Sequence, residues 1–175
     1  MKVLVTGGVR SGKSRHAEEL LAAYDAVTYV APGPTLDEDH DPDWAARIRA
    51  HRARRSSGWT TLESRDLASA LETEGPVLVD CLGTWLTAVM DAGALWEASS
   101  DEVHAHVEQH LAAAVAALAV TTDPVVLVTN EVGLGVIPEH RSGRLFRDLL
   151  GLVNQRVATA CDEVHLVMAG RVLKL

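Results

Sequence analysis

The sequence predicts an α/β fold with a mostly parallel sheet that is covered by helices on both faces. Strand-like and helix-like patterns alternate along the 175 residues. The strand-like segments are continuous apolar runs, which are typical of strands buried on both faces. A glycine-rich loop lies between the first predicted strand and the first predicted helix. This is the position at which α/β proteins hold phosphate groups.

The chain begins with a predicted strand, helix and second strand. Lys2–Thr6 is an apolar run and predicts a buried strand. Ser14–Tyr24 carries apolar residues at helical spacing and predicts a helix. Val27–Ala31 is again apolar and predicts the second strand, because the turn Pro32-Gly33-Pro34 follows it directly. The acidic segment Asp37–Asp43 then predicts a loop.

A second unit follows this acidic loop. Trp44–Arg55 has a helical pattern rich in arginine, and Trp59–Glu63 predicts a short strand. Apolar residues within Leu67–Leu71 predict a short helix, and Val77–Asp80 is a buried strand that ends in an acid. In open α/β sheets, ligands bind beyond the carboxyl ends of the strands. Asp80 is therefore expected at the same edge as the glycine-rich loop.

The second half of the chain continues the alternation and ends in a hairpin. Ser99, with Glu102 three residues later, has the signature of a capped helix. The turn Ala169-Gly170 separates two short segments, so the last strand is expected to run antiparallel to the one before it. The predicted elements are a helix from Ser99 to about Ala119, a strand at Val125–Thr129, a helix at Ser142–Cys161, and strands at Val164–Met168 and Arg171–Leu175.

Length and composition limit the class of protein. A chain with 47% apolar residues fits one globular domain, residues 1–175. No apolar stretch reaches the ~18 residues of a membrane span, and the first strand leaves no room for a signal peptide. The net charge of −8 argues against a nucleic-acid partner. Cys81 and Cys161 do not form a disulfide framework, so the expected location is cytoplasmic.

The glycine-rich loop predicts a nucleotide site. Residues Gly7-Gly8-Val9-Arg10-Ser11-Gly12-Lys13-Ser14 fit the pattern G-x-x-x-x-G-K-[ST] between a strand and a helix. Glycines let backbone N–H groups converge on an anion, and the helix N-terminus adds about half a positive charge. Lys13 is expected to contact the β and γ phosphates, and the Ser14 hydroxyl to ligate Mg²⁺.

The arginine-rich helix allows two interpretations. Trp44, Ile48, His51 and Arg55 fall on one helical face, and further arginines flank them. Composition alone favours an amphipathic surface helix with the histidine in its buried stripe. The functional interpretation is a cationic cradle for a triphosphate. In that cradle a neutral His51 acts as the nucleophile, and the arginines stabilise charge on the attacked phosphorus.

Five other residues have side chains that could matter at such a site. Asp80 resembles the acid that holds Mg²⁺ in P-loop enzymes. Glu131 is a second candidate for positioning metal or water, or equally a polar residue in a turn. His106 and His110 have the spacing H-x-x-x-H, but no third ligand is evident, so packing is the preferred interpretation. Cys81 is interpreted as a small buried residue.

Several blocks of the sequence resemble one family. The loop Gly7–Ser14 matches its narrower form, Gly-Gly-x-Arg-Ser-Gly-Lys-Ser. The other matching blocks are Arg47-Ile48, His51-Arg52 and Arg55, then Trp59, Thr61 and Glu63, Val79–Leu82 with Thr84-Trp85-Leu86, Thr129–Pro138, Arg144 with Phe146–Asp148, and Asn154-Gln155. From Lys2 to Lys174 the chain resembles the bifunctional adenosylcobinamide kinase / adenosylcobinamide-phosphate guanylyltransferases of cobalamin biosynthesis.

This resemblance implies two reactions and a fold. The kinase phosphorylates the aminopropanol hydroxyl of adenosylcobinamide with a nucleoside triphosphate, ATP or GTP. The guanylyltransferase then moves GMP from GTP onto adenosylcobinamide phosphate through a GMP–histidine intermediate, which gives adenosylcobinamide-GDP. The implied fold is a three-layer P-loop NTPase (RecA-like) fold, with a mostly parallel sheet and an antiparallel C-terminal strand. The implied assembly is a homotrimer.

The resemblance also implies roles for particular residues. His51 matches the guanylylated histidine, and Lys13 is the second catalytic residue. Ser14 and Asp80 are the implied Mg²⁺ contacts, through the nucleotide. The implied nucleotide contacts are Gly7, Gly8, Val9, Arg10, Ser11, Gly12, Lys13, Ser14, Ala31, Pro32, Gly33, Arg52, Ala53, Arg54, Arg55, Glu63 and Asp80. The chain departs from the family where Ala31-Pro32-Gly33 replaces the more usual Ala-Thr.

Three other functions fit parts of the sequence. A P-loop small-molecule kinase without nucleotidyl transfer would need no nucleophilic histidine. A signalling GTPase would need the guanine motif Asn-Lys-x-Asp, which this chain does not contain. A nucleotide-gated binding module would need no catalysis, but Ser14 and Asp80 together argue against it.

Overall fold

All seven strands form one sheet. The computed structural model describes residues 1–175, and the strand order is β3-β2-β4-β5-β1-β6-β7. Every neighbouring pair is parallel except β6 and β7, so the predicted antiparallel C-terminal strand is confirmed. The strands are β1 (Lys2–Thr6), β2 (Thr28–Val30), β3 (Thr60–Leu62), β4 (Val77–Asp80), β5 (Val125–Val128), β6 (Glu163–Met168) and β7 (Arg171–Lys174).

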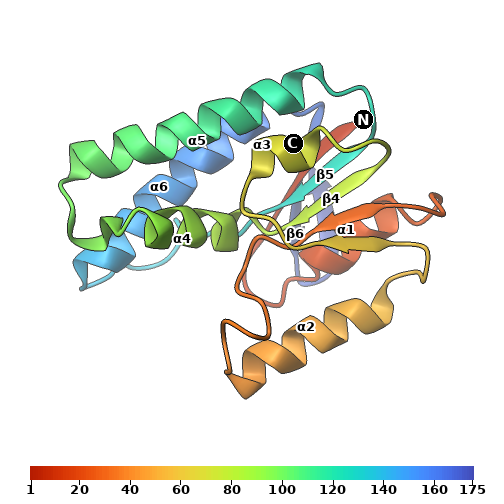
Figure 1. Cartoon of the computed structure of the whole chain (residues 1–175), viewed down its shortest axis with the longest axis horizontal. Coiled ribbons are helices and arrows are strands. Elements are labelled where there is room, and N and C mark those ends of the chain that lie inside the picture. Colours follow the sequence, from red (N-terminus) through yellow and green to blue (C-terminus); the bar gives the residue numbers. More distant parts are fainter.

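Helices cover both faces of the sheet, which confirms the predicted α/β class (Figure 1). The helices α3, α4, α5 and α6 lie on one face, and α1 and α2 lie on the other. They are α1 (Lys13–Leu20), α2 (Pro42–Arg54), α3 (Leu67–Leu71), α4 (Leu82–Ala92), α5 (Ser100–Val120) and α6 (Arg141–Ala158), with a 3₁₀ turn, η1, at Leu95–Glu97.

Two apolar cores follow from the alternation of side chains along the strands. Leu4 of β1 belongs to a core of 26 buried residues beneath α3, α4, α5 and α6. Its neighbours Val3 and Val5 belong to a core of 10 buried residues beneath α1. Successive side chains of a strand point to opposite faces, so a continuous apolar run supplies both cores. This is why the strands lack an alternating polar pattern.

Helix α4 is absent from the sequence-based prediction. Its buried residues include Leu82, Trp85, Leu86 and Met90, and the less buried stripe opposite them has one charged residue, Asp91. Periodicity does not distinguish a buried helix from a buried strand when most positions are apolar. The helix also begins directly after β4, with Cys81 as its N-cap instead of a Ser, Asp or Asn signal. The weak polar stripe and the lack of an ordinary cap signal in the sequence explain the omission.

Helix α2 begins earlier than predicted and is attached by its polar side chains. Asp41 caps it by accepting the Asp43 N–H at 2.9 Å, and Pro42 occupies the first turn. The predicted acidic loop therefore ends in a helix start. No residue of α2 is buried, and Figure 1 shows it set apart below the sheet. Its orientation depends on the few side chains that reach the sheet and α1.

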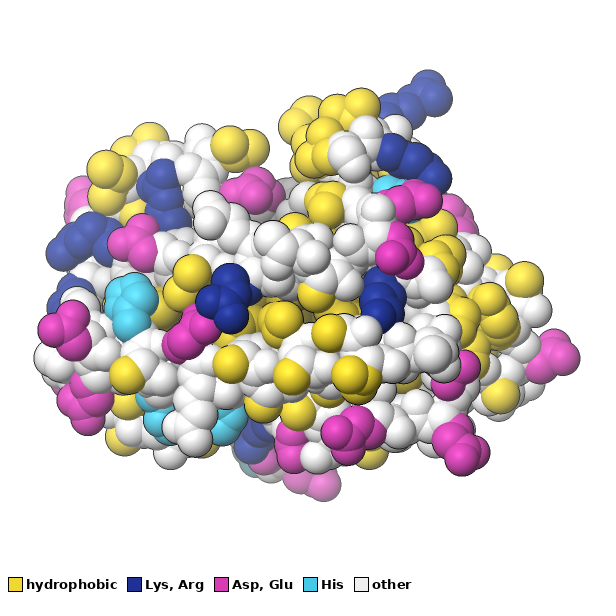
Figure 2. Space-filling model, turned by 90° about the horizontal axis from the view of Figure 1, so that it is seen from above, with side chains coloured by type: hydrophobic (Ala, Val, Ile, Leu, Met, Phe, Trp, Pro, Cys, Tyr) yellow, Lys and Arg dark blue, Asp and Glu magenta, His cyan; other side chains and the backbone are white.

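Charged and apolar side chains are mixed on the face of the molecule above α5. Figure 2, which views the molecule from the side of α5, shows acidic and basic side chains interspersed among apolar ones, with no continuous basic stripe. None of the helices has both the length and the apolar character that crossing a membrane requires. The net charge remains −8.

Candidate active site

The glycine-rich loop forms a cradle at the carboxyl end of β1. Arg10 (φ 57°) and Gly12 (φ 98°) both adopt left-handed backbone conformations, which only glycine adopts without strain. The Lys13 ammonium donates to the Gly8 carbonyl at 3.1 Å, and burial lowers the pKa of Lys13. The β6–β7 turn supports the loop, because the Gly170 N–H donates to the Ser11 carbonyl at 2.9 Å.

A cavity of about 710 Å³ opens over this loop, and we call it the P-loop cavity. This volume is typical of small-molecule sites. Its lining is strongly cationic for a protein of net charge −8, and it brings the loop and helix α2 together. The walls are Val9, Arg10, Ser11, Gly12, Lys13, Ser14, Arg15, Arg47, Ala50, His51, Arg54, Asn130 and Gly170.

A second cavity lies between α2 and the sheet, and we call it the α2–sheet cavity. His51 and Arg47 belong to the walls of both cavities, so the two meet at α2. Its walls are Tyr29, Ala31, Gly33, Pro34, Thr35, Trp44, Arg47, Ile48, His51, Arg52, Arg55, Thr61, Glu63, Asp80, Cys81 and Thr84. The lining therefore combines aromatic rings, small residues and a few charges, as ligand sites commonly do.

Glycine at position 33 allows Trp44 to approach the strand end closely. A Cβ atom at Gly33 would lie 3.1 Å from Cζ2 of Trp44 and 3.3 Å from Cβ of Thr84. The Trp44 indole N–H donates to the Pro34 carbonyl at 2.9 Å, which holds the ring in this place. The segment Ala31-Pro32-Gly33 stands where the family more usually has Ala-Thr. The Trp44 ring occupies the space that a side chain at position 33 would need.

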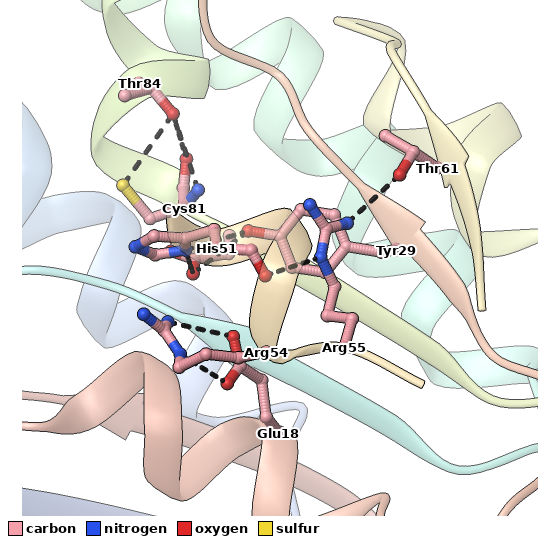
Figure 3. Close-up of polar contacts among 9 residues, drawn as sticks. Glu18, Tyr29, His51, Arg54, Arg55, Thr61, Cys81 and Thr84 are labelled. Carbon is pink, nitrogen blue, oxygen red and sulfur yellow. Dashed lines mark hydrogen bonds and ion pairs between the residues drawn. The ribbon is translucent and has the colours of Figure 1, made fainter. Parts of the chain in front are cut away.

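His51, Asp80 and Tyr29 form a compact polar cluster in the wall of the α2–sheet cavity, and Figure 3 shows His51 beside Tyr29. Nδ1 of His51 lies 3.5 Å from Oδ2 of Asp80 and 3.4 Å from the Tyr29 hydroxyl. The Tyr29 hydroxyl donates to Oδ2 of Asp80 at 3.2 Å. Burial alone would raise the pKa of Asp80, but contacts with His51, Ser14 and Tyr29 outweigh burial and lower it.

Strand register explains why Tyr29 and Asp80 meet. Tyr29 of β2 is paired with Leu78 of β4, and Asp80 follows Leu78 by two residues. Residues two apart on a strand point to the same face, so Asp80 is the diagonal neighbour of Tyr29. Helix α2 then places His51 over this pair from the same side of the sheet.

The arginines of α2 already have partners. Arg52 pairs with Glu63 at 2.9 Å, and Arg54 donates twice to Glu18 at 3.1 Å. The Arg55 guanidinium lies 3.7 Å from the centre of the Tyr29 ring and donates to the Thr61 hydroxyl at 3.0 Å. Burial lowers the pKa of Arg55. These contacts attach α2 to α1, β2 and β3, so the arginines orient the helix as well as supplying charge.

The structure brings most of the predicted site residues together. The loop from Val9 to Ser14 and Arg54 line the P-loop cavity, and the Gly8 carbonyl accepts hydrogen bonds from Lys13 and from the Ser11 N–H. His51 lines both cavities, and the α2–sheet cavity contains Ala31, Gly33, Arg52, Arg55, Glu63 and Asp80. Four predicted contacts lie outside both cavities: Gly7 and Gly8 in the loop, the buried Pro32 and the exposed Ala53.

Sequence reasoning missed Tyr29 and gave Asn130 no specific role. Tyr29 looks like an ordinary apolar strand residue, and only its register with β4 places its hydroxyl beside Asp80. Asn130, and not its neighbour Glu131, lines the P-loop cavity. The Asn154 amide donates to the Asn130 carbonyl at 3.1 Å and so holds this segment from α6. The pairing of two asparagines in separate blocks has no local sequence signal.

The remaining candidates take structural roles. The Glu131 carboxylate accepts the Gly133 N–H at 2.9 Å, as a polar residue in a turn does. His106 and His110 lie with ring centres 4.9 Å apart, and no group of residues suited to a metal ion includes them. The expected packing role fails for His110, which is exposed. Burial raises the pKa of Cys81, which fits an inert thiol.

The donor atoms near the P-loop fit a magnesium ion carried by a nucleotide. Mg²⁺ binds one or two protein oxygens and otherwise water and phosphate oxygens. The Ser14 hydroxyl and the Asp80 carboxylate supply two such oxygens, and the lowered pKa of Asp80 keeps its carboxylate charged. Ser14 is the second residue of α1 and directly follows Lys13. The residues present therefore match the expected ion.

Comparison with known proteins reveals one family. Residues 3–175 match the family described as cobinamide kinase / cobinamide phosphate guanyltransferase. The bifunctional adenosylcobalamin biosynthesis protein CobU of Salmonella typhimurium is 38% identical, over 100% of this chain and 99% of that protein. CobU of Escherichia coli is also 38% identical with the same coverage, and CobP of Pseudomonas aeruginosa is 36% identical over 97% and 94% of the two chains.

Proposed function

Because the chain belongs to the cobinamide kinase / cobinamide phosphate guanyltransferase family, we propose that it catalyses both reactions in cobalamin biosynthesis. It phosphorylates adenosylcobinamide with a nucleoside triphosphate. It then transfers GMP from GTP through a GMP–His51 intermediate to adenosylcobinamide phosphate, and adenosylcobinamide-GDP is the product. The protein is accordingly a transferase with ATP and GTP as its nucleotide substrates.

The position of His51 at the junction of the two cavities carries this proposal. The P-loop cavity offers cations and backbone N–H groups to phosphates, and the α2–sheet cavity offers aromatic and small side chains to a nucleoside. A nucleotide that fills both has its α-phosphate where they meet. His51 lines both cavities and is therefore placed to attack that phosphorus.

The same P-loop serves both reactions. In the kinase reaction the γ-phosphate moves to the aminopropanol hydroxyl, and Lys13 stabilises the charge on the transferred group. In the guanylyl reaction the loop holds the pyrophosphate that leaves. Ser14 and Asp80 would hold Mg²⁺ on the nucleotide, and this ion neutralises charge on the phosphates when bound. Arg47 and Arg54 face the same cavity and add positive charge there.

The proposed nucleotide contacts follow the two cavities. Residues Val9 to Ser14 take the phosphates, and Ala31, Gly33, Arg52, Arg55 and Glu63 border the nucleoside. The contacts of Gly7, Gly8, Pro32 and Ala53 are supported by the resemblance alone. We further propose a homotrimer and a cytoplasmic location, on the strength of the family resemblance and of two cysteines that form no disulfide.

Incubation with Mg²⁺-GTP followed by mass spectrometry tests the proposal. A mass increase of one GMP, located in the peptide of residues 47–55, is the expected result. Label from γ-³²P GTP should enter adenosylcobinamide, whereas label from α-³²P GTP should enter the protein first. A chain that transfers the γ label but never takes up the α label would be a P-loop kinase without nucleotidyl transfer.

A further inference from the structure

The cluster around His51 distinguishes its two ring nitrogens. We infer that Nε2 is the atom that carries GMP, and that Asp80 and Tyr29 position His51 for this by holding Nδ1. The inference rests on the proposed function, because it assigns an atom within the proposed intermediate. It also gives Tyr29 a role that its place in an apolar strand does not suggest.

Both neighbours of Nδ1 are hydrogen-bond acceptors. Oδ2 of Asp80 lies 3.5 Å away and carries no proton when the carboxylate is charged. The Tyr29 hydroxyl has one proton, and it donates that proton to Oδ2 at 3.2 Å. It therefore presents a lone pair to Nδ1 at 3.4 Å. Nδ1 can form hydrogen bonds with these two acceptors only when it carries the ring hydrogen. The neutral ring then keeps its lone pair on Nε2.

The other ring nitrogen is free to react. Nε2 of His51 makes no hydrogen bond within the chain, and Figure 3 shows it pointing away from Tyr29. His51 is itself part of the wall of the P-loop cavity, where the phosphates are proposed to lie. Nε2 therefore has a lone pair next to the proposed phosphate site, while Asp80 and Tyr29 fix the ring through Nδ1. This is the arrangement of an oriented nucleophile.

The step balances with the groups present. The Nε2 lone pair forms a bond to the α-phosphorus of GTP, and the bond from that phosphorus to the β-bridging oxygen breaks. Pyrophosphate leaves with the electron pair. The ring becomes an imidazolium that still carries its Nδ1 hydrogen, and the Asp80 carboxylate compensates its positive charge. In the second step a phosphate oxygen of adenosylcobinamide phosphate attacks the phosphorus, and the electron pair returns to Nε2.

Tyr29 is held in place independently of His51. The Arg55 guanidinium lies over its ring at 3.7 Å, and Arg55 is fixed in turn by the Thr61 hydroxyl at 3.0 Å. Tyr29→Phe removes the hydroxyl and keeps these ring contacts. The exposed Tyr24 lies outside both cavities, so Tyr24→Phe is a matched control.

NMR of the guanylylated protein identifies the linked atom. The wild-type chain, labelled with ¹⁵N in histidine, is incubated with Mg²⁺-GTP and unfolded in base, in which a phosphoramidate survives. We expect ¹⁵N–³¹P coupling to Nε2 of His51. Coupling to Nδ1 would overturn the inference and leave the proposed function standing. Absence of any histidine adduct would overturn the proposed function itself, and the inference with it.

Kinetics of the tyrosine variants test the positioning role. Tyr29→Phe should slow single-turnover guanylylation at saturating GTP by about 10- to 100-fold, because the ring of His51 loses part of its orientation. The KM for GTP should change by less than about threefold, since the lost contact is not made to the substrate. Tyr24→Phe should match the wild type. A wild-type rate in Tyr29→Phe would remove Tyr29 from the inference.

Discussion

The guanidinium of Arg54 and the carboxylate of Glu18 form a double hydrogen bond, with both N–O distances at 3.1 Å, that ties helix α2 to helix α1. Helix α1 begins at the P-loop, and α2 carries His51. Because α2 has no buried residue, its position depends on contacts of this kind. The pair therefore links the phosphate cradle to the proposed nucleophile.

We expect Glu18→Gln to slow guanylyl transfer more than phosphoryl transfer. The bidentate ion pair is lost, and a partly exposed pair of this type contributes about 1 kcal/mol, or roughly fivefold in rate if α2 must be docked. The two rates are measured with α- and γ-labelled GTP. Glu19→Gln is the control, because Glu19 only meets the exposed Arg15 on the same helix. Equal losses in both rates would exclude a special role in docking α2.

Lys13→Ala should remove both activities. One P-loop holds the phosphates in both reactions, and Lys13 is the lysine that lines its cavity. Loss of a cation directed at transition-state charge costs on the order of 10²–10⁴ in rate. Steady-state turnover with adenosylcobinamide measures the effect, and Lys2→Ala, outside both cavities, is the control. Kinase turnover at the wild-type level would show that the phosphates bind elsewhere.

His51→Ala should separate the two reactions. Guanylyl transfer needs a covalent acceptor for GMP, whereas direct γ-phosphoryl transfer needs none, so kinase activity should persist at least in part. The wild-type adduct should be labile to acid and stable to base, as a phosphoramidate is. The exposed His104 on α5 supplies the control variant His104→Ala. Uptake of α-³²P label by His51→Ala would contradict the assignment of the nucleophile.

Asp80→Asn should slow both reactions and raise the Mg²⁺ concentration needed for half-maximal activity. The carboxylate is one of two proposed oxygen contacts for the ion, and it also faces His51 at 3.5 Å. Magnesium titrations of the variant and the wild type provide the measurement, and circular dichroism confirms that the variant folds. An identical magnesium titration would count against the metal role of Asp80.

The hairpin should contribute to stability in a pH-dependent way through Glu163. Hydrogen bonds from Lys174 and then from His165 lower the pKa of Glu163 to about 2 from 4.5. A depressed folded-state pKa stabilises the protein above pH 4.5, and this contribution is lost as the pH falls from 4.5 towards 2. In Glu163→Gln, the free energy of unfolding measured by circular dichroism should fall less steeply over that pH interval than in the wild type.

The control for this measurement is Glu72→Gln, because the exposed Glu72 side chain makes no hydrogen bond or ion pair. Its acid unfolding curve should overlay that of the wild type. If Glu163→Gln also overlaid the wild type, the contacts with Lys174 and His165 would not favour the charged form in solution.

Short sequence patterns predicted much of the fold, because the segments concerned can be recognised from neighbouring residues alone. Buried strands are apolar throughout, and the phosphate loop is defined by eight consecutive residues, Gly7–Ser14. The final hairpin follows from the turn at Ala169-Gly170. Helix α4 escaped prediction because its less buried stripe has one charged residue, Asp91, so the contrast that identifies a surface helix is weak.

The sequence by itself determined the phosphate loop and the arginine-rich helix, since each depends on residues within a few positions of one another. Its family resemblance added the prediction that His51 is the nucleophile. Only the tertiary structure decided that His51 faces Asp80 and Tyr29, and that Arg54 is joined to Glu18. The register of β2 with β4 and the docking of α2 set these contacts. Their energies arise between residues far apart in the chain, so no local spacing encodes them.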